Sequence, residues 1–142
     1  GFRTFDNEVT YEKNYWSIKC SHDGYLPRYG VIHQRNLKFD VDKNILFGKE
    51  KLIKKKNFKV TNFDIRFHLL PNIKVTKLQD NKSVLIELEN SGWRFFSNDG
   101  LIGVETGLYF GNKNKYIENQ NIFISGITQN NEQLIEWQIS KI

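Results

Sequence analysis

Apolar and polar side chains alternate in the stretch Phe63-Asp64-Ile65-Arg66-Phe67-His68-Leu69. Successive side chains of a β-strand point to opposite faces of its sheet. One face of this strand would carry Phe63, Ile65, Phe67 and Leu69. The other would carry Asp64, Arg66 and His68. The stretch therefore predicts a strand with one apolar side and, on its other side, an Arg that an Asp and a His flank.

The same alternation recurs along the chain, with turn residues every 8 to 15 positions. It predicts ten strands: Tyr15–Ser21, Tyr29–Val41, Asn44–Ile53, Phe58–Leu70, Ile73–Gln79, Ser83–Glu89, Trp93–Ser97, Gly100–Phe110, Tyr116–Ile127 and Gln133–Ile139. Turn chemistry such as Asp80-Asn81-Lys82 and Asn98-Asp99-Gly100 separates them. Strands with such short connections are antiparallel and stack in layers. We predict an all-β fold, an antiparallel β-sandwich of about ten to twelve strands with little helix.

Composition favours one domain over residues 1–142. A chain of 142 residues with 39% hydrophobic and 14% aromatic residues buries one core of ordinary size. No stretch approaches the ~20 apolar residues of a membrane span, so no membrane partner is predicted. Aromatic residues interleaved with lysines suit stacking on single-stranded nucleic acid, but no RNP-like motif accompanies them. No nucleic-acid partner is predicted either.

Six lysines lie close together and contribute to the formal charge of +5: Lys49, Lys51, Lys54, Lys55, Lys56 and Lys59. One interpretation is a solvated loop or an edge strand that discourages aggregation between strands. The other is a surface that attracts a polyanion.

Cysteine and histidine usage argues against a metal site or a cofactor. Cys20 is the only cysteine, and the alternation places it on the apolar side of its strand, where we expect an inert thiol. The three histidines show no H-x-H spacing, and no C-x-x-C pair is possible. No phosphate-binding Gly-rich loop is present either. We predict no metal and no cofactor.

His33 and Arg35 share one face of their predicted strand with Val31, Leu37 and Phe39. Burial of an unpaired charge on such an apolar face is very costly. The two side chains must therefore be paired inside the protein or line a groove. Arg66, beside Asp64 and His68, suits either a salt-bridged network or a clamp on a carboxylate or sulfate. We expect Arg66→Ala to break a buried pair with Asp64, which typically costs ~3–5 kcal/mol, whereas a change of an exposed lysine stays within ~0.5 kcal/mol.

Two segments carry the most specific pattern of the chain. The first runs from Ser21-His22-Asp23-Gly24-Tyr25 to Arg28-Tyr29-Gly30-Val31-Ile32-His33-Gln34-Arg35, and the second is Arg66-Phe67-His68-Leu69-Leu70-Pro71. Their order and spacing resemble the carboxyl-terminal part of heparinase II/III-like proteins, where the stretches read roughly SHDGY, R-x-G-x-x-H-R-R and R-F-H-L-x-P. The similarity continues in Gly92-Trp93-Arg94-Phe95, Glu105 with Tyr109, Gln120 with the apolar run to Gly126, and Trp137. It covers most of residues 20–140.

The resemblance implies a polysaccharide lyase that cleaves uronic-acid-containing glycans by β-elimination. Such proteins join an α/α-toroid domain to a large antiparallel β-sandwich. Their catalytic Tyr, His and Asn or Arg residues lie mainly on the toroid and early in the sandwich, so this chain is expected to follow them and to hold no catalytic residue. The implied partners are an acidic polysaccharide and the α/α-toroid domain of the parent protein. A periplasmic or cytoplasmic bacterial location is the accompanying expectation.

The candidate substrate-binding residues are His22, Tyr25, His33, Arg35, Arg66 and His68. For His22 and Tyr25 the alternative is a tight turn set by Asp23-Gly24. Gln34 stands where the family usually has an Arg, and Leu70 where a second His often follows, which weakens anion binding but leaves the fold assignment intact.

A free-standing module that binds carbohydrate or another partner is the alternative function. Trp16, Trp93 and Trp137 would then stack on sugar rings, whereas their positions in alternating strands favour the core.

Overall fold

The computed structural model describes residues 4–11, 15–22, 31–55, 60, 62–110 and 116–142, with the backbone alone for residues 4–11, 15–22, 109, 110 and 116. These residues form eleven strands and no helix. The first six are β1 (Thr4–Tyr11), β2 (Tyr15–His22), β3 (Val31–Asp40), β4 (Ile45–Lys54), β5 (Asn62–His68) and β6 (Lys74–Lys77). The other five are β7 (Ser83–Glu87), β8 (Gly92–Phe96), β9 (Leu101–Phe110), β10 (Tyr116–Ile127) and β11 (Glu132–Lys141).

All ten predicted strands are confirmed over the described residues, with small differences at their ends, and β1 is the strand that the pattern missed. Residues 29, 30, 58, 59 and 61 of the predicted strands lie outside the described residues. The pairing of β1 with β2 shifts register between Phe5 and Glu8. A bulge of this kind interrupts the alternation on which the prediction rests. The Asp6-Asn7 pair inside it also has the composition of a turn.

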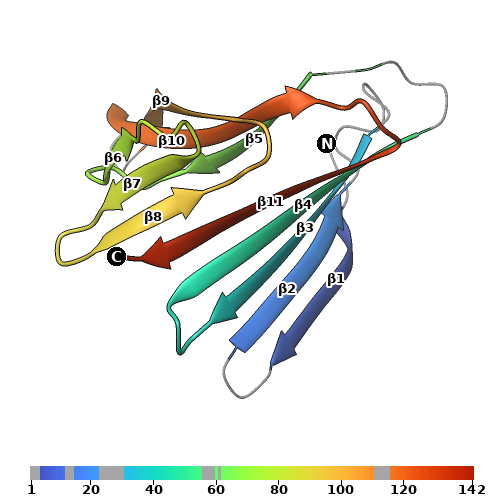
Figure 1. Cartoon of the computed structure of the whole chain (residues 1–142), viewed down its shortest axis with the longest axis horizontal. Helices are drawn as coiled ribbons and strands as arrows, with labels where there is room; N and C mark the ends of the chain where they lie inside the picture. The colour runs from blue at the N-terminus through green and yellow to red at the C-terminus, as the bar shows by residue number, and fades with distance from the viewer. Residues whose placement is uncertain (1–3, 12–14, 23–30, 56–59, 61, 111–115) are drawn as a thin grey trace.

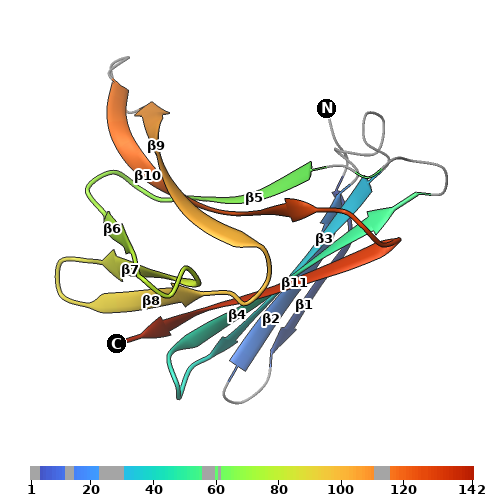
Figure 2. The ribbon, with the colours of Figure 1, turned by 45° about the horizontal axis from the view of Figure 1, so that its top comes forward.

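The strands form two antiparallel sheets that pack face to face (Figure 1). The large sheet has the order β1-β2-β3-β4-β11-β8-β7-β6, and the small sheet has the order β5-β10-β9. The chain reaches the small sheet through β5, then β9 and β10, and it returns to the middle of the large sheet as β11. The turned view in Figure 2 shows the small sheet as a separate layer over part of the large one. The predicted fold class, an all-β sandwich, is confirmed.

The core lies between the two layers. From the large sheet it takes residues such as Val84, Phe95 and Ile135, and from the small sheet residues such as Ile122 and Ile124, each at most 1% exposed. The Phe67 ring crosses between the sheets, with its centroid 5.1 Å from Phe95 and 4.8 Å from Trp137. Each large apolar side chain buried in this way contributes ~1.5–3 kcal/mol.

The predicted core role is confirmed for Trp137, which is 5% exposed, and Trp93 is half-buried against the core. Trp93 Nε1 also donates a hydrogen bond to Ser91 Oγ at 3.0 Å. The side chains of Trp16 and Cys20 lie outside the described residues.

Turn residues adopt the left-handed backbone conformation where the sequence predicts turns. Positive φ angles occur at Asn44 (52°), Asn72 (69°), Asn81 (60°) and Gly100 (73°). Asparagine and glycine tolerate this region better than other residues. The connections between the strands are therefore determined locally.

Asp80 fixes the turn between β6 and β7. Its Oδ1 accepts hydrogen bonds from the backbone N–H groups of Lys82 and Ser83, both at 2.9 Å. Its Oδ2 accepts one from the Ser83 hydroxyl at 2.7 Å and one from Arg94 Nη2 at 3.3 Å. These donors, the Lys82 N–H first, lower the pKa of the Asp80 carboxyl from its usual 3.8 to about 2.

We expect Asp80→Ala to destabilise the protein at neutral pH, by an amount that shrinks in acid. A carboxylate whose pKa is lower in the folded state stabilises that state above its unfolded pKa, and the contribution is lost as the pH falls through the folded pKa. For Asp80 the loss runs from about pH 4 down to about pH 2. Urea unfolding of parent and variant between pH 7 and pH 2 measures this, with Asp42→Ala in an exposed turn as the control. An equal difference at every pH would contradict the prediction.

The lysine-rich run does not form a sheet edge. Lys49, Lys51 and Lys54 lie in β4, which is paired on both sides, with β3 and with β11. The interpretation as an aggregation-blocking edge is therefore wrong for this part of the run. Lys51 Nζ lies 3.3 Å from Glu132 Oε1 in an exposed ion pair. Lys56 and Lys59 lie outside the described residues.

No helix long and apolar enough to cross a membrane occurs in the described part of the chain.

Candidate functional site

The four candidate residues whose side chains the structure describes do not form one site. His33 and Arg35 lie on β3 of the large sheet, and Arg66 and His68 lie on β5 of the small sheet. His22 ends β2 and pairs with His33 in the backbone register, which brings the two main chains together. The side chain of His22 and the whole of Tyr25 lie outside the described residues. The candidates therefore divide between two sheets.

Glu50 of β4 holds His33 and Arg35 inside the sandwich. The Glu50 side chain is fully buried, and its Oε1 accepts a hydrogen bond from Arg35 Nε at 2.5 Å. Its Oε2 lies 3.4 Å from Nε2 of His33, which is 8% exposed. The Arg35 guanidinium, 31% exposed, also lies 5.2 Å from the centre of the Phe67 ring. This cluster satisfies the predicted requirement for a partner on the apolar face, and it joins β3 to β4.

The sequence analysis did not identify Glu50. Its signal was present, because Gly48, Glu50 and Leu52 are all buried and lie on one side of β4. The alternation was missed because the neighbouring lysines suggested that the whole segment is exposed to solvent. Arg35 and Glu50 are direct partners in the antiparallel register, a relation that appears only once the strands are paired.

Arg66 lies on the outward face of the small sheet, between two acidic side chains. Its Nη1 donates to Glu105 Oε2 at 2.8 Å, and its Nη2 donates to Asp64 Oδ2 at 3.3 Å. The guanidinium also stacks on Phe123, 5.3 Å from the ring centre. The hydrogen bond to Glu105 is the main cause that raises the pKa of Arg66, so the cation is retained. The predicted pair with Asp64 is confirmed, and Glu105 of β9 is an additional partner.

His68 bonds to an asparagine rather than to Arg66. Its Nδ1 lies 2.9 Å from Oδ1 of Asn121 on β10. Asn119 Nδ2 donates to the Leu69 carbonyl at 2.9 Å and to Asn121 Oδ1 at 3.3 Å. Asn119 and Asn121 are only 6% and 7% exposed, and within the described residues Asn119 Oδ1 has no hydrogen-bond partner.

Gly107 of β9 leaves room for these two amides. A Cβ at this position would lie 2.5 Å from Asn121 Nδ2 and 2.9 Å from Asn119 Oδ1. The small sheet thus carries a polar surface of Arg66, His68, Asn119 and Asn121 beside the Phe123 ring, and we call it the Arg66 face. Sequence reasoning missed both asparagines because residues 119–121 look like polar positions of a solvated strand.

The expected buried pair at Arg66 is wrong. The side chains of Arg66, Asp64 and Glu105 are 37%, 48% and 55% exposed. Water screens ion pairs of this kind, so each contributes only ~0.2–1 kcal/mol. The three side chains lie on the outward face of the small sheet, where water reaches them.

We expect Arg66→Ala to lower the free energy of unfolding by about 1–2 kcal/mol. The loss comes from two exposed ion pairs and one cation–π contact. Urea unfolding at neutral pH measures it, and Lys55→Ala serves as the control for an exposed cation. A loss near ~3 kcal/mol, the range of buried pairs, would contradict the exposed geometry.

Within the described ranges, no group of three or more His, Cys, Asp or Glu residues is placed to hold a metal ion. The predicted absence of a metal and a cofactor stays a prediction.

Residues 3–138 match the family model described as "Heparinase II/III-like, C-terminal". The match spans nearly the whole chain, and the chain therefore belongs to this family. No curated protein matches the chain.

Two solved structures share the fold. The heparan sulfate lyase HepC from Pedobacter heparinus aligns with a TM-score of 0.80 at 14% identity, over 99% of this chain and 21% of that one. A protein described as the Heparinase III-BT4657 gene product aligns with a TM-score of 0.72 at 13% identity, again over 99% and 21%. The chain thus spans about a fifth of the length of these two proteins.

Proposed function

We propose that residues 1–142 form the carboxyl-terminal β-sandwich domain of a longer polysaccharide lyase that acts by β-elimination on uronic-acid-containing glycans. In this proposal the chain contributes structure and part of the substrate groove, and the chemical step takes place on the preceding α/α-toroid and early sandwich. Family membership supports the enzyme class. The shared fold with a heparan sulfate lyase, of which this chain corresponds to about a fifth, supports the role as one part of a larger protein.

The Arg66 face supports the assignment of a groove. Uronate elimination requires a cation that neutralises the sugar carboxylate, in addition to a base near C5 and an acid for the leaving oxygen. Arg66 is held in one orientation by Glu105 and Asp64 yet stays 37% exposed. Its two acidic partners are themselves about half exposed, so an incoming carboxylate can exchange with them in water.

The neighbours of Arg66 suit a sugar. Phe123 offers an aromatic surface, and His68 presents an imidazole whose orientation Asn121 fixes. His33 and Arg35 are turned toward Glu50 instead, so their role in this proposal is structural.

An elimination assay tests whether the chemical step takes place outside this domain. Formation of unsaturated uronate is followed by ultraviolet absorbance on acidic glycans, with the 142-residue chain and with its full-length parent. We expect turnover by the parent and none by the isolated chain. Turnover by the chain would overturn its non-catalytic role. A parent without a helical domain before this sandwich would overturn the lyase assignment and favour the free-standing module.

Arg66→Ala in the full-length parent tests the groove. Loss of a charge-assisted hydrogen bond to substrate, ~1.5–3 kcal/mol, corresponds to a rise in KM of about tenfold or more. Lys55→Ala is the matched control for a lost exposed cation. An unchanged KM for Arg66→Ala would remove the Arg66 face from the substrate groove.

A further inference from the structure

The small sheet has two edge strands, β5 and β9, and β9 is the longer of them. Every residue of β9 from Leu101 to Phe110 pairs with β10 without a shift of register. Within the described residues, no strand pairs with β9 on its other side. About half of the N–H and C=O groups of an antiparallel strand point to each side, so a row of them in β9 has no backbone partner in the described part of the chain. A free edge of this length, ~34 Å, is a template for a further strand.

Both edges of the large sheet carry features that discourage pairing with another strand. β1 contains the register shift between Phe5 and Glu8. β6 has only four residues, and Lys74 and Lys77 stand at its ends. A bulge, a short strand and edge lysines are three means by which proteins protect exposed edges.

The small sheet has such features at β5 but not at β9. β5 carries the charged side chains of Asp64 and Arg66. β9 contains no Lys, Arg or Pro, and the carboxylate of its one charged residue, Glu105, accepts a hydrogen bond from Arg66 of the same sheet. Low charge and the absence of proline are typical of strands that associate readily. Of the four sheet edges in the described part of the chain, β9 alone lacks these protective features.

Two exposed leucines lie on β9, one on each face of the small sheet. Leu101 is 74% exposed and Leu108 is 63% exposed. They point to opposite faces because an odd number of positions separates them in one strand. Ile102 of the same strand is buried, so β9 is anchored in the core and its position is fixed. A strand added at the free edge would bring side chains against both leucines.

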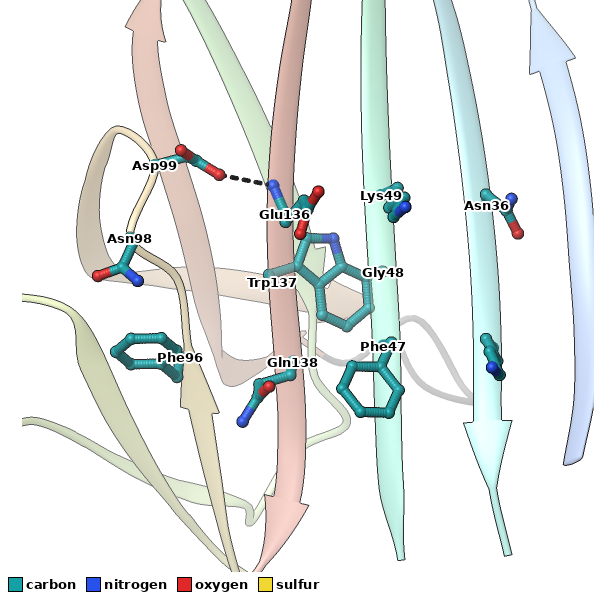
Figure 3. Close-up of a pocket in the computed structure, with 11 residues that line it drawn as sticks. Asn36, Phe47, Gly48, Lys49, Phe96, Asn98, Asp99, Glu136, Trp137 and Gln138 are labelled. Carbon is teal, nitrogen blue, oxygen red and sulfur yellow. Dashed lines mark hydrogen bonds between the residues drawn. The ribbon is translucent and has the colours of Figure 1, made fainter. Parts of the chain in front are cut away.

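The groove on the outward face of the large sheet offers no comparable signal. It has a volume of about 690 Å³, and its lining includes Lys49, Asp99 and Glu136. Figure 3 shows the Asp99 carboxylate at the N–H of Glu136, with Lys49 on the neighbouring strand. Charges of both signs line this groove, so it does not select one class of partner.

We infer that the free edge of β9 binds a β-strand from the part of the parent protein outside residues 1–142, which adds a fourth strand to the small sheet. The inference rests on the proposed function, in which the chain is one domain of a longer lyase. Both solved structures that share the fold have about four-fifths of their length outside the aligned part, so a parent of similar length supplies the partner within the same polypeptide. Covalent linkage gives that strand a high effective concentration at the edge, which a second copy of the chain does not have. A shared sheet would fix the Arg66 face relative to the rest of the parent.

Hydrogen–deuterium exchange of the full-length parent and of the 142-residue chain tests the inference. In a free antiparallel edge about half of the amide protons face solvent and exchange rapidly, whereas a strand paired on both sides protects nearly all of them. We expect the peptide over residues 101–110 to be half protected in the 142-residue chain and fully protected in the parent. β10, which is paired on both sides, is the internal reference for full protection. Half protection of β9 in the parent would overturn the inference, and so would full protection in the isolated chain, where a second copy covers the edge.

Leu108→Lys tests the edge by substitution, because it gives β9 an edge lysine like those of β6. In the parent we expect the free-side amides of β9 to exchange about tenfold faster, from loss of the apolar contact at this position. The thermal midpoint of the 142-residue chain should stay unchanged, because Leu108 is already exposed there. Val41→Lys, at a 52% exposed apolar residue in the turn after β3, is the matched control and should leave the exchange of β9 unchanged. Equal exchange rates of β9 in the parent and in its Leu108→Lys variant would contradict the inference.

The exchange experiment and the elimination assay fail independently. Full protection of β9 in a parent that shows no elimination would support the strand pairing and overturn the proposed function alone. An active parent with a half-protected β9 would overturn the strand pairing alone.

Discussion

Replacing Glu50 with alanine is expected to lower the free energy of unfolding by about 3 kcal/mol. The Glu50 side chain is fully buried, and its carboxylate receives the Nε–H of Arg35 at 2.5 Å and lies 3.4 Å from the His33 ring. Its removal leaves the guanidinium without an anion between two packed sheets. Because Arg35 is 31% exposed, water relieves part of this cost, and we expect the lower end of the ~3–5 kcal/mol range for broken buried pairs.

Urea unfolding of the single and double variants separates the cost of an unpaired charge from the cost of lost packing. Arg35→Met combined with Glu50→Leu should recover most of the loss, because no unpaired charge then remains inside. Glu132→Ala is the control, since this acid forms an exposed pair with Lys51 on the same sheet and should change stability by no more than ~0.5 kcal/mol. A loss at Glu50 no larger than that at Glu132 would show that the cluster does not stabilise the sandwich.

Gly48→Ala is expected to destabilise the protein by ~1–3 kcal/mol, because it forces a methyl group into a filled core. A Cβ on Gly48 would lie 2.0 Å from Trp137 Cε2. The indole ring cannot move aside freely, because it is 5% exposed and packs 5.6 Å from Phe95 and 4.8 Å from Phe67, measured between ring centres. Without a clash, alanine within a strand stabilises the folded state relative to glycine by roughly 0.5–1 kcal/mol. A decrease in the free energy of unfolding would therefore show that the added methyl group clashes with Trp137.

Gly92→Ala provides the matched control at another strand position. The nearest atoms to its Cβ would be those of Ile142 at 4.0 Å, an ordinary contact. Its thermal midpoint should equal or exceed that of the parent. If Gly48→Ala and Gly92→Ala melt alike, Trp137 is not packed against β4 in the way described.

Much of the fold was predictable because its signals are local. The alternation at residues 63–69 placed Ile65 on the apolar face of its strand and Arg66 on the opposite face, as observed. Asparagine and glycine in the turn segments predicted the positions of the connections, and Asn44, Asn72, Asn81 and Gly100 there adopt positive φ. The exception is β1, where a bulge interrupts the alternation.

The candidate site was predictable in part only. The rule against unpaired buried charge correctly required a partner for His33 and Arg35, but it did not identify Glu50, which follows Arg35 by fifteen positions. The partners of Arg66 and His68 that were missed, Glu105 and Asn121, are 39 and 53 positions away. The groove on the outward face of the large sheet likewise takes its lining from β3, β4, β8 and β11, and no single segment of the sequence contains that set of residues.

The sequence by itself determined which residues form strands, which side of each strand is apolar, and, through the order of its motifs, the family. The strands and their apolar sides depend on neighbours one to four positions apart, and the family is indicated by short motifs in a fixed order along the chain. Only the tertiary structure decided that β11 returns between β4 and β8, which aligns Phe47, Gln138 and Phe96, and that the candidate residues divide between two sheets. Strand order and burial arise from packing between segments that are distant in the sequence. An ion pair is buried or exposed according to what covers it, and the amino-acid pattern of a single strand does not contain that information.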